Sequence, residues 1–382
     1  MREVQTAAVQ LLAELVGIDS VNPGLVPGAA GERRIVEHLR IRLASAGFTT
    51  TVVPAAGHPD RPSLVAVPPG PSDAPTVVLN GHLDTVGVIG MAAPFTPRIE
   101  GDRLWGRGAA DMKGGVAAIV TAAEHLVAIG APVRPVLALV ADEEDASAGS
   151  QAVISALPRL GVRPDACLIA EPTDLAPSRS LRGFAVVRVT LTGRAAHSSM
   201  AEQGVNAITH LGRLLHAVDQ RAAALRAAGA DLMVTVVRGG ESPFVVPEHA
   251  ECLVELRTTP DRPSAEAAEE VRSLLEPEWQ AEAELIAHRD GWRLDAAGPA
   301  AVLAGRLGAQ LGTAATFDAP YWMEASLWQQ VCPTVVCGPS GGGLHAVDEW
   351  VDLRQVRAFT TALVRVLSAW TPSGQHPPAA ER

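Results

Sequence analysis

A short apolar run that ends in a histidine and an aspartate is the feature that most restricts the fold of this chain. Residues 77–80 read Val-Val-Leu-Asn, which is typical of a buried strand, and His82 and Asp84 follow in the next turn. In open α/β sheets, ligands gather at the carboxyl ends of the strands, where such turns lie. We therefore predict that a buried strand delivers His82 and Asp84 to a functional site.

Strand-like and helical patterns alternate along the first half of the chain. Apolar runs at 136–141 and 166–170 predict further strands, and residues 115–129 have helical spacing and end at Gly130. This alternation indicates a mostly parallel sheet with helices on both faces. The same patterns predict helices at 3–17, 31–46 and 353–370, and strands at 48–54, 63–67, 315–317 and 334–337. We expect the tail from Thr371 to be disordered.

The order of the patterns changes in the middle of the chain. Strand and helix patterns then follow each other as βαββαβ, which is the order of a ferredoxin-like unit. The predicted strands are 184–191, 232–237, 250–257 and 281–287, and the helices 204–217 and 265–275. We therefore predict a catalytic α/β domain built from residues 1–180 and 295–382, interrupted by an inserted α+β domain at 181–294.

Charge and hydropathy restrict the partners that the protein can bind and the compartment in which we expect it. The formal net charge of −11 argues against nucleic-acid binding, which needs a basic surface. The N-terminus lacks the pattern of a signal peptide, and no apolar run reaches the roughly 20 residues that span a bilayer. We expect a cytoplasmic protein that binds neither nucleic acid nor membrane. The four cysteines lie in apolar surroundings, which predicts buried free thiols.

Acids and histidines follow several of the strand-like segments. They are His82 with Asp84, Asp111, Glu143 with Glu144, Glu171, and His345. Each has a simple structural interpretation, such as a helix cap for Asp111 or a solvated turn for the glutamate pair. Together, two imidazoles and three carboxylates at one sheet edge predict two divalent ions, because a carboxylate can bridge metals about 3.5–4 Å apart. Nitrogen and oxygen ligands suit Zn²⁺, with Co²⁺ or Mn²⁺ as alternatives.

Two acids are predicted to assist the metals. Asp84, two residues from His82, is placed to hold the second ring nitrogen of that histidine. Of the adjacent Glu143 and Glu144, only one can easily bind a metal. The other is then free to act as a general base on water.

Five motifs give the chain a resemblance to the M20 family of metallopeptidases and amidohydrolases, over residues 5–370. They are Gly81-His82-Leu83-Asp84-Thr85-Val86, Gly106 to Gly115, Asp142-Glu143-Glu144, Glu171-Pro172-Thr173, and His345 to Glu349. The family includes acetylornithine deacetylase, succinyl-diaminopimelate desuccinylase and glutamate-releasing carboxypeptidases. The resemblance implies a catalytic domain of the zinc-aminopeptidase type, and it makes the inserted domain a lid through which two chains form a homodimer.

The resemblance also implies roles. His82 and Glu171 would bind one metal, Glu144 and His345 the other, and Asp111 would bridge them. Asp84 would orient His82, and Glu143 would be the general base. In the lid, His197 matches the histidine that stabilises the oxyanion, in the same chain or across the dimer, and Arg257 matches the arginine that binds a substrate carboxylate. Backbone N–H groups of the loop at Ser340 and Gly341 are candidates for the same carboxylate.

Two departures from the family pattern concern the substrate pocket. Phe244-Val245-Val246-Pro247 stands where the family often has an asparagine before Val-Ile-Pro. Met323-Glu324-Ala325, preceded by Tyr321 and Trp322, stands in place of Thr-Asp-Ala. Both changes add bulk or apolar surface, so we expect a less polar pocket than a succinyl-specific enzyme needs.

The sequence thus predicts a dinuclear metal-dependent amidohydrolase that removes an N-acyl group from an amino-acid-like or peptide-like substrate, as acetylornithine deacetylase does. Within the same chemistry, a carboxypeptidase or dipeptidase and a pathway-specific deacylase are alternatives. Outside it, the alternative is a silent homologue that binds without catalysis, which would usually have lost some of these ligands.

Overall fold

The computed structural model describes residues 1–71 and 73–371, and their contacts divide the chain into two units. The first comprises Met1–Arg179, Leu294–Phe317 and Leu327–Arg382, and the second Ser180–Arg293 and Asp318–Ser326. The expected bounds differ from this division by one residue at Ser180 and at Leu294, and in Asp318–Ser326, which was expected in the catalytic domain. In this segment, Trp322 Nε1 donates to the carbonyl oxygen of Asp290 at 3.1 Å, and strand β14 (Phe317–Ala319) pairs with β8 (Ser178–Leu181).

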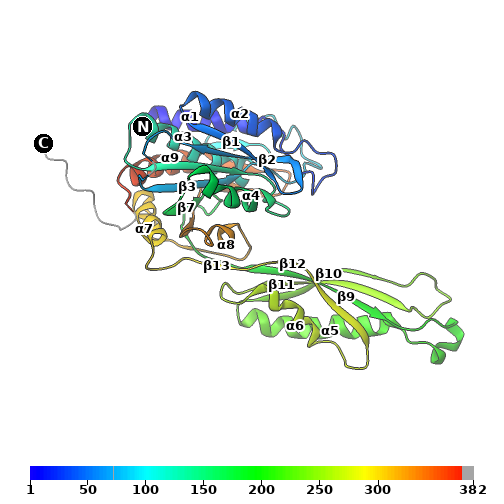
Figure 1. The fold of residues 1–382 in the computed structure, drawn as a ribbon. Coiled ribbons are helices and arrows are strands. Elements are labelled where there is room, and N and C mark those ends of the chain that lie inside the picture. Colours follow the sequence, from blue (N-terminus) through cyan, green and yellow to red (C-terminus); the bar gives the residue numbers. More distant parts are fainter. Residues whose placement is uncertain (72, 372–382) are drawn as a thin grey trace. The chain divides into compact units, whose positions relative to one another are not determined.

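The first unit contains a six-stranded sheet in the order β1-β2-β6-β3-β7-β15 (Figure 1). The strands are β1 (Thr49–Ala55), β2 (His58–Val67), β3 (Thr76–His82), β6 (Arg134–Val140), β7 (Ala166–Ile169) and β15 (Thr334–Val336). Strands β6, β3, β7 and β15 are parallel, whereas β1 and β2 pair antiparallel at one edge. The prediction of a mostly parallel α/β sheet is confirmed.

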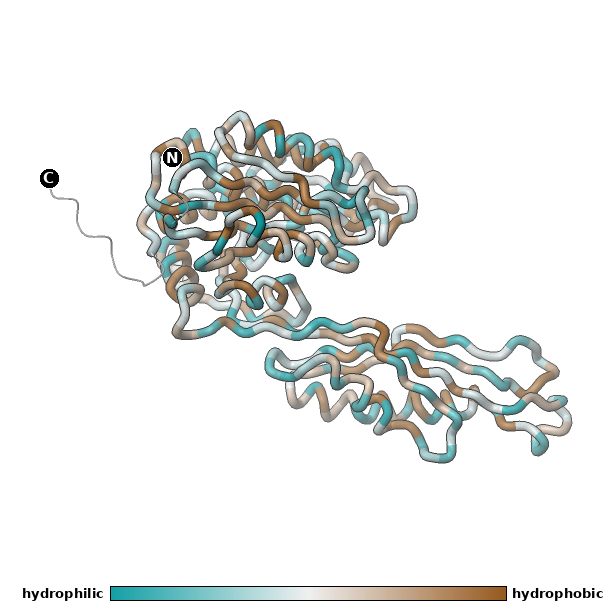
Figure 2. The backbone as a smooth tube through the Cα atoms, in the orientation of Figure 1, coloured by the Kyte–Doolittle hydropathy of each residue, from teal (hydrophilic) through white to brown (hydrophobic). Residues whose placement is uncertain are grey.

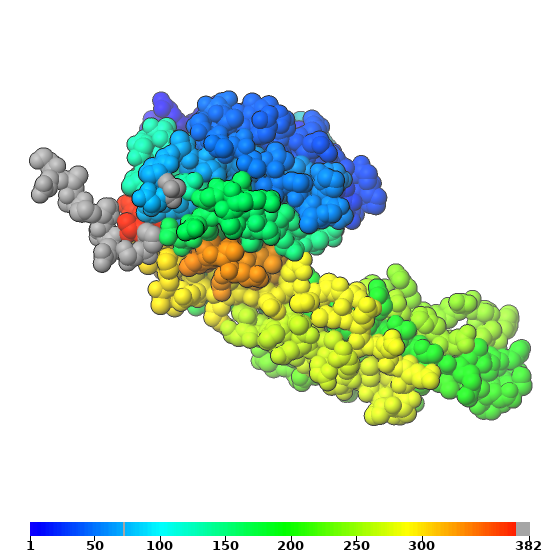
Figure 3. All heavy atoms as spheres, in the orientation of Figure 1, coloured from blue at the N-terminus to red at the C-terminus, as the bar shows by residue number. Residues whose placement is uncertain are grey.

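Helices cover both faces of this sheet (Figure 1). On one face lie α1 (Arg2–Val16), α2 (Arg33–Ser45), α3 (Gly114–Ala128) and α9 (Leu353–Ser368), and on the other α4 (Ala148–Ala156). The outward face of α2 forms part of the molecular surface (Figure 3). Two further helices, α7 (Pro299–Leu311) and the short α8 (Ala325–Trp328), precede β15.

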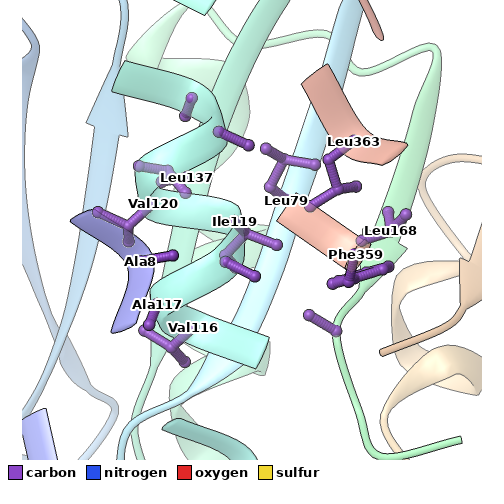
Figure 4. Packing of buried hydrophobic residues seen from close by; sticks show 14 of the residues in the cluster. Ala8, Leu79, Val116, Ala117, Ile119, Val120, Leu137, Leu168, Phe359 and Leu363 are labelled. Atoms are coloured by element: carbon purple, nitrogen blue, oxygen red, sulfur yellow. The ribbon is translucent and has the colours of Figure 1, made fainter. Parts of the chain in front are cut away.

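The core of the first unit lies between the sheet and the larger helical layer (Figure 4). Leu79, Leu137 and Leu168 point from neighbouring strands towards Ile119 of α3 and Phe359 of α9, and all five are fully or almost fully buried. The strands of this sheet form continuous hydrophobic stretches in Figure 2, as expected for parallel strands that are covered on both faces.

Two small sheets accompany the central sheet, and the second of them contains strands of both units. One has the order β16-β17-β5-β4 and the other β13-β8-β14. Their remaining strands are β4 (Arg98–Glu100), β5 (Arg103–Trp105), β16 (Gly341–Gly342), β17 (Trp350–Asp352) and β13 (Trp292–Arg293). Strand β14 begins two residues later than the strand predicted at 315–317. Strands of two or three residues are too short to give a recognisable alternation.

The second unit is a four-stranded antiparallel sheet with two helices. The chain order is β9 (Gly183–Thr192), α5 (Ala207–Ala227), β10 (Asp231–Gly239), β11 (His249–Thr258), α6 (Ala267–Arg272) and β12 (Gln280–Arg289). The spatial order β10-β11-β9-β12 confirms the predicted ferredoxin-like unit. Buried and half-exposed residues alternate along β9 and β11, as expected where helices cover one face of the sheet.

Two expectations concern the C-terminal tail and membrane-spanning helices. The tail predicted to be disordered lies, from residue 372 on, outside the described residues. Within the described part, no helix is both long enough and apolar enough to cross a bilayer.

We predict that the cysteines of the native protein react slowly with a thiol reagent such as DTNB at pH 8. All four thiols are free and buried, and burial raises the pKa of Cys252 to about 11 and that of Cys337 to about 12. Below these values the thiols are neutral and therefore poor nucleophiles. The same protein in denaturant should titrate four thiols, and rapid labelling of the native protein would contradict the prediction.

Candidate metal centre

Three adjacent strands of the central sheet end at the same level and deliver most of the predicted ligands. His82 is the last residue of β3 and pairs with Val140 at the end of the parallel strand β6. The acidic turn with Glu143 and Glu144 follows β6, and Glu171 follows β7 two residues after its end. The parallel register therefore brings these turns together at one sheet edge.

The small sheet supplies the other two side chains. Asp111 lies between β5 and α3, in a segment where the Asp111–Met112 peptide bond is cis. His345 lies in the loop between β16 and β17, with a positive φ of 61°. Because β17 pairs with both β16 and β5, this sheet holds the two segments side by side. Asp111 and His345 thus follow strands of the small sheet and not of the central one.

The five predicted ligands converge in the structure. Asp111 Oδ1 lies 3.1 Å from His82 Nε2, and Asp111 Oδ2 lies 3.2 Å from His345 Nε2. His345 Nε2 is also 3.2 Å from Glu144 Oε2, and His82 Nε2 is 3.8 Å from Glu171 Oε1. The two oxygens of Asp111 therefore face different histidines, which is the arrangement expected of a carboxylate that bridges two ions.

The donor set fits divalent cations. His82, Glu143 and Glu171 offer ligand atoms within 4.8 Å of one another, and so do His82, Asp111 and Glu144. Oε1 of Glu144 is buried and has no hydrogen-bond partner among the described residues. A buried carboxylate oxygen without a donor is costly unless a cation satisfies it. Imidazole and carboxylate ligands without thiolate suit zinc and similar ions.

The electrostatics of the cluster are dominated by its crowded carboxylates. Hydrogen bonds with Asp111 and Glu144 raise the pKa of His345 to about 10. Burial favours the neutral form of His82, but the carboxylates of Glu171 and Asp111 outweigh burial and raise its pKa well above the ordinary value. Burial and the nearby charge of Asp111 raise the pKa of Glu144. The cluster therefore attracts positive charge strongly.

Comparisons with known proteins identify the family. Residues 78–369 match Peptidase family M20/M25/M40. The chain belongs to the M20 family. It is 30% identical over 342 residues to acetylornithine deacetylase of Pasteurella multocida, covering 84% of this chain and 86% of that protein. It is 31% identical over 390 residues to succinyl-diaminopimelate desuccinylase of Cereibacter sphaeroides (strain ATCC 17029 / ATH 2.4.9), covering 94% and 97%.

Solved structures share the fold at lower sequence identity. A tripeptidase from Staphylococcus aureus superposes with a TM-score of 0.79 at 17% identity, covering 95% of this chain and 98% of that one. An M20 metallo-carboxypeptidase from Sulfolobus solfataricus gives 0.74 at 16% identity, covering 94% and 98%. This M20 protein is accordingly a metallo-hydrolase that acts on amide bonds, with the catalytic and lid domains of its structural neighbours.

Asp84 supports the centre differently from the prediction. Nδ1 of His82 donates to the backbone carbonyl of Asp84 at 3.0 Å, while the nearest carboxylate oxygen of Asp84 is 3.7 Å from that nitrogen. The carboxylate accepts instead from the backbone N–H groups of Glu143 and Glu144, each at 3.1 Å. The backbone carbonyl of Asp84 therefore orients His82, and the carboxylate of Asp84 orients the acidic turn.

Glu349 has the corresponding task for Asp111, and the sequence reasoning assigned it no role. Its carboxylate accepts from the backbone N–H groups of Gly108, Ala110 and Asp111 at 2.9–3.1 Å. Arg107 Nη1 donates to the same carboxylate at 2.7 Å, and Arg107 Nη2 reaches the carbonyl of Ala346 at 3.0 Å. Glu349 and Arg107 thus fix the segments that carry Asp111 and His345.

Lys113, the only lysine of the chain, does not form part of the ligand cluster. It is buried, and Nζ donates to the backbone carbonyl of Ile18 at 2.9 Å. Burial lowers its pKa to about 7. Lys113 therefore ties the segment after Asp111 to the loop that follows α1.

The glycine-rich loop is used differently from the expectation. The N–H of Ser340 donates to Gln355 Oε1 at 2.8 Å, so it is already engaged. Gly341 pairs with Val351, and a Cβ atom there would lie 1.8 Å from the carbonyl oxygen of Trp350. The glycine is therefore required by the close approach of β17, and a contact of this loop with substrate stays a prediction.

The lid segments around His197 and Phe244 lie side by side in the second unit. His197 forms an isolated antiparallel β-bridge with Val245, and the N–H of Ser198 donates to the carbonyl of Phe244 at 3.0 Å. His197 Nδ1 accepts from the N–H of Ser199 at 3.2 Å, which leaves the ring proton on Nε2. Phe244 is 70% exposed, so its bulk lies at the surface of the unit.

Arg257 has partners of its own in the second unit. Its Nη2 lies 2.6 Å from Glu255 Oε1, and its guanidinium carbon lies 5.5 Å from the centre of the Phe184 ring. Of the two other residues predicted to bind substrate, Tyr321 is exposed and Glu324 is buried. All these residues belong to the second unit, so their contacts with substrate stay predictions.

We predict that Glu349→Ala weakens Zn²⁺ binding by roughly 10- to 100-fold, the usual effect of removing a residue that orients a ligand. The variant loses the acceptor that holds the N–H of Asp111 and leaves Arg107 buried without its carboxylate. Competition with a chromophoric chelator would measure the affinity. Glu37→Ala, at an exposed glutamate of α2, is the control. Equal affinities of the two variants would contradict the role of Glu349.

Proposed function

We propose that this chain is a dinuclear metal-dependent amidohydrolase that removes an N-acyl group from an amino-acid-like substrate with a free carboxylate. The observation that carries the proposal is Asp111, whose two oxygens face His82 and His345 at 3.1 and 3.2 Å, with Glu143 in the same cluster. A carboxylate placed between two histidines, with a further carboxylate beside them, is what a two-metal hydrolase requires.

The proposed ligand assignment is the one that the family resemblance implies, and the short distances within the cluster support it. His82, Glu171 and Asp111 would hold one ion, and Asp111, Glu144 and His345 the other. Two ions bound there would polarise the amide carbonyl and lower the pKa of a water molecule, with Zn²⁺ as the first candidate and Co²⁺ or Mn²⁺ as alternatives. A family relative, the Bacillus subtilis YxeP protein, is described as a dinuclear metal-binding peptidase, which supports two ions and not one.

Glu143 is the proposed proton carrier. Its N–H is fixed by Asp84, and its carboxylate lies among the ligand atoms of His82 and Glu171. It takes a proton from water as the oxygen adds to the amide carbon, and it returns this proton to the nitrogen as the C–N bond breaks. The products are a carboxylic acid and a free amine, so no further reactant is needed.

The second unit provides the proposed substrate contacts. Nε2–H of His197 is the donor for the negative charge that develops on the carbonyl oxygen. Arg257 has five N–H donors and can bind a substrate carboxylate while it keeps Glu255. Phe244, Tyr321 and Glu324 line the proposed acyl or side-chain pocket. We further propose a cytoplasmic homodimer formed through the lid, in which His197 serves its own or the partner's site.

We expect Glu143→Ala to lower kcat by about 10²- to 10⁴-fold, the range for loss of a general acid–base. Metal content should stay near that of the wild type, because the proposed ligands are intact. Metal analysis together with steady-state kinetics would check both values. Glu144→Ala is the contrasting variant, since it should lose metal as well as activity. Full activity of Glu143→Ala would show that another group carries the proton.

A substrate screen tests the class of substrate. We expect the protein supplied with Zn²⁺, Co²⁺ or Mn²⁺ to hydrolyse N-acetyl amino acids with a higher kcat/KM than dipeptides or N-acyl glutamates. A chelator should abolish the activity. Preference for dipeptides or N-acyl glutamates would instead identify a dipeptidase or carboxypeptidase, and no hydrolysis with any metal would favour a silent binding homologue.

A further inference from the structure

A chain of buried polar side chains runs from the start of α2 to the acidic turn after β6. Arg61 binds Glu32 through Nε at 2.9 Å and binds Asp142 Oδ1 through Nη1 at 2.8 Å. Asp142 is the residue directly before Glu143. Glu32 is fully buried, and Arg61 and Asp142 are 7% and 4% exposed. A charged network this deep needs each charge to be paired.

Asn22 connects this network to Asp84. Its Nδ2 donates to Asp84 Oδ2 at 2.8 Å and to Asp142 Oδ1 at 3.2 Å. Its Oδ1 accepts from the N–H of Gly24 at 2.8 Å, which fixes the amide so that the NH₂ group faces both carboxylates. Asn22 is fully buried. One amide group thus holds together two carboxylates that would otherwise repel each other.

The last hydrogen bonds of the network reach the backbone of Glu143, the proposed base, and of Glu144, a proposed ligand. Asp84 accepts from the N–H groups of Glu143 and Glu144, so its position sets where both side chains start. Asp142 itself adopts φ +69°, a conformation that L residues rarely adopt. Two sides of this turn are therefore held by Arg61 and Asn22 in a conformation that the turn would not favour alone.

We propose that Arg61 and Asn22 are positioning residues, which hold Asp142 and Asp84 so that Glu144 binds metal and Glu143 reaches the reacting water. Neither residue belongs to the metal-ligand cluster found among the described residues. The part that concerns Glu143 rests on the proposed function, whereas the part that concerns Glu144 requires only a metal site. The two parts can therefore fail separately.

The chain offers a matched control for Arg61. Arg42 of α2 forms the same kind of bidentate pair with Glu124 of α3, at 2.7 and 2.8 Å, in the same unit. That pair joins α2 to α3 and is more exposed, with 29% and 18% of the two side chains accessible. Arg42→Met therefore removes an ion pair between packed elements without touching the network.

The variants to compare are Arg61→Lys, Arg61→Met combined with Glu32→Gln, Asn22→Ala and Arg42→Met. Arg61→Lys keeps the charge but loses the fork that reaches Glu32 and Asp142 together. The double variant removes both charges, so that no buried glutamate is left without a partner. Urea unfolding of each full-length protein establishes that it is folded and gives its loss of stability.

The decisive measurement is Zn²⁺ affinity, obtained on metal-stripped protein by competition with a chelator. We expect the Asn22 and the double Arg61 variants to bind Zn²⁺ roughly 10- to 100-fold more weakly, Arg61→Lys to fall between them and the wild type, and Arg42→Met to bind as the wild type does. On a substrate that the wild type hydrolyses, kcat should fall while KM stays nearly constant, because the substrate contacts are unchanged.

A double-mutant cycle separates positioning from general loss of stability. Arg61 and Asn22 share Asp142 Oδ1, so their effects on Zn²⁺ affinity should be less than additive, whereas those of Arg42→Met and Asn22→Ala should add. Wild-type affinity in the Arg61 and Asn22 variants, or additive effects, would overturn the proposal. If the wild type hydrolyses no amide, the proposed function fails, and the Zn²⁺ affinities still decide the positioning of Glu144.

Discussion

The first unit is organised around the repulsion between carboxylates that its sheet brings to one buried edge. Asp111, Glu143, Glu144 and Glu171 meet there, with Asp84 directly behind. Charges of one sign at such distances repel strongly where water is excluded, unless cations or hydrogen-bond donors balance them. The histidines and the proposed metal ions act from within the cluster. Around the cluster, Asn22, Arg61 and Arg107 donate to the supporting carboxylates of Asp84, Asp142 and Glu349.

Both supporting carboxylates act through the backbone of the residues they position. The carboxylate of Glu349 accepts a hydrogen bond from the backbone N–H of Asp111, and Arg107 balances its charge. The carboxylate of Asp84 accepts hydrogen bonds from the backbone N–H groups of Glu143 and Glu144. A side chain that is positioned by its own backbone keeps its carboxylate oxygens free for a metal. The unsatisfied Oε1 of Glu144 is the direct expression of this arrangement. Buried arginines further out then stabilise the supporting carboxylates, and not the ligands themselves.

The sequence was sufficient to predict a site residue where a local pattern, such as a buried strand, leads directly to it. Buried strands with polar turns after them pointed to His82, Glu171 and the pair Glu143–Glu144, because a parallel sheet aligns its strand ends. It was insufficient where a residue has a local interpretation that hides a distant contact. Glu32 precedes a helix, and Arg61 lies in a loop pattern next to a proline; their pairing across 29 positions leaves no periodic signal. Strand β16 was also not predicted, because a strand of two residues is too short to show an alternating pattern.

The proposed metal ligands and the proposed substrate contacts belong to different units, so overall identity to a relative does not by itself indicate the substrate. The chain is 30% identical to an acetylornithine deacetylase and 31% identical to a succinyl-diaminopimelate desuccinylase, two enzymes whose names specify different acyl groups. Residues 82–171 and His345 build the metal cluster, whereas Phe244, Arg257 and Tyr321 belong to the lid. Changes in the lid leave the two supporting networks intact, since both lie in the first unit. Under the proposed function, substrate choice depends on these lid residues, and Phe244 and Glu324 lie in the two segments where the sequence departs from the expected family pattern.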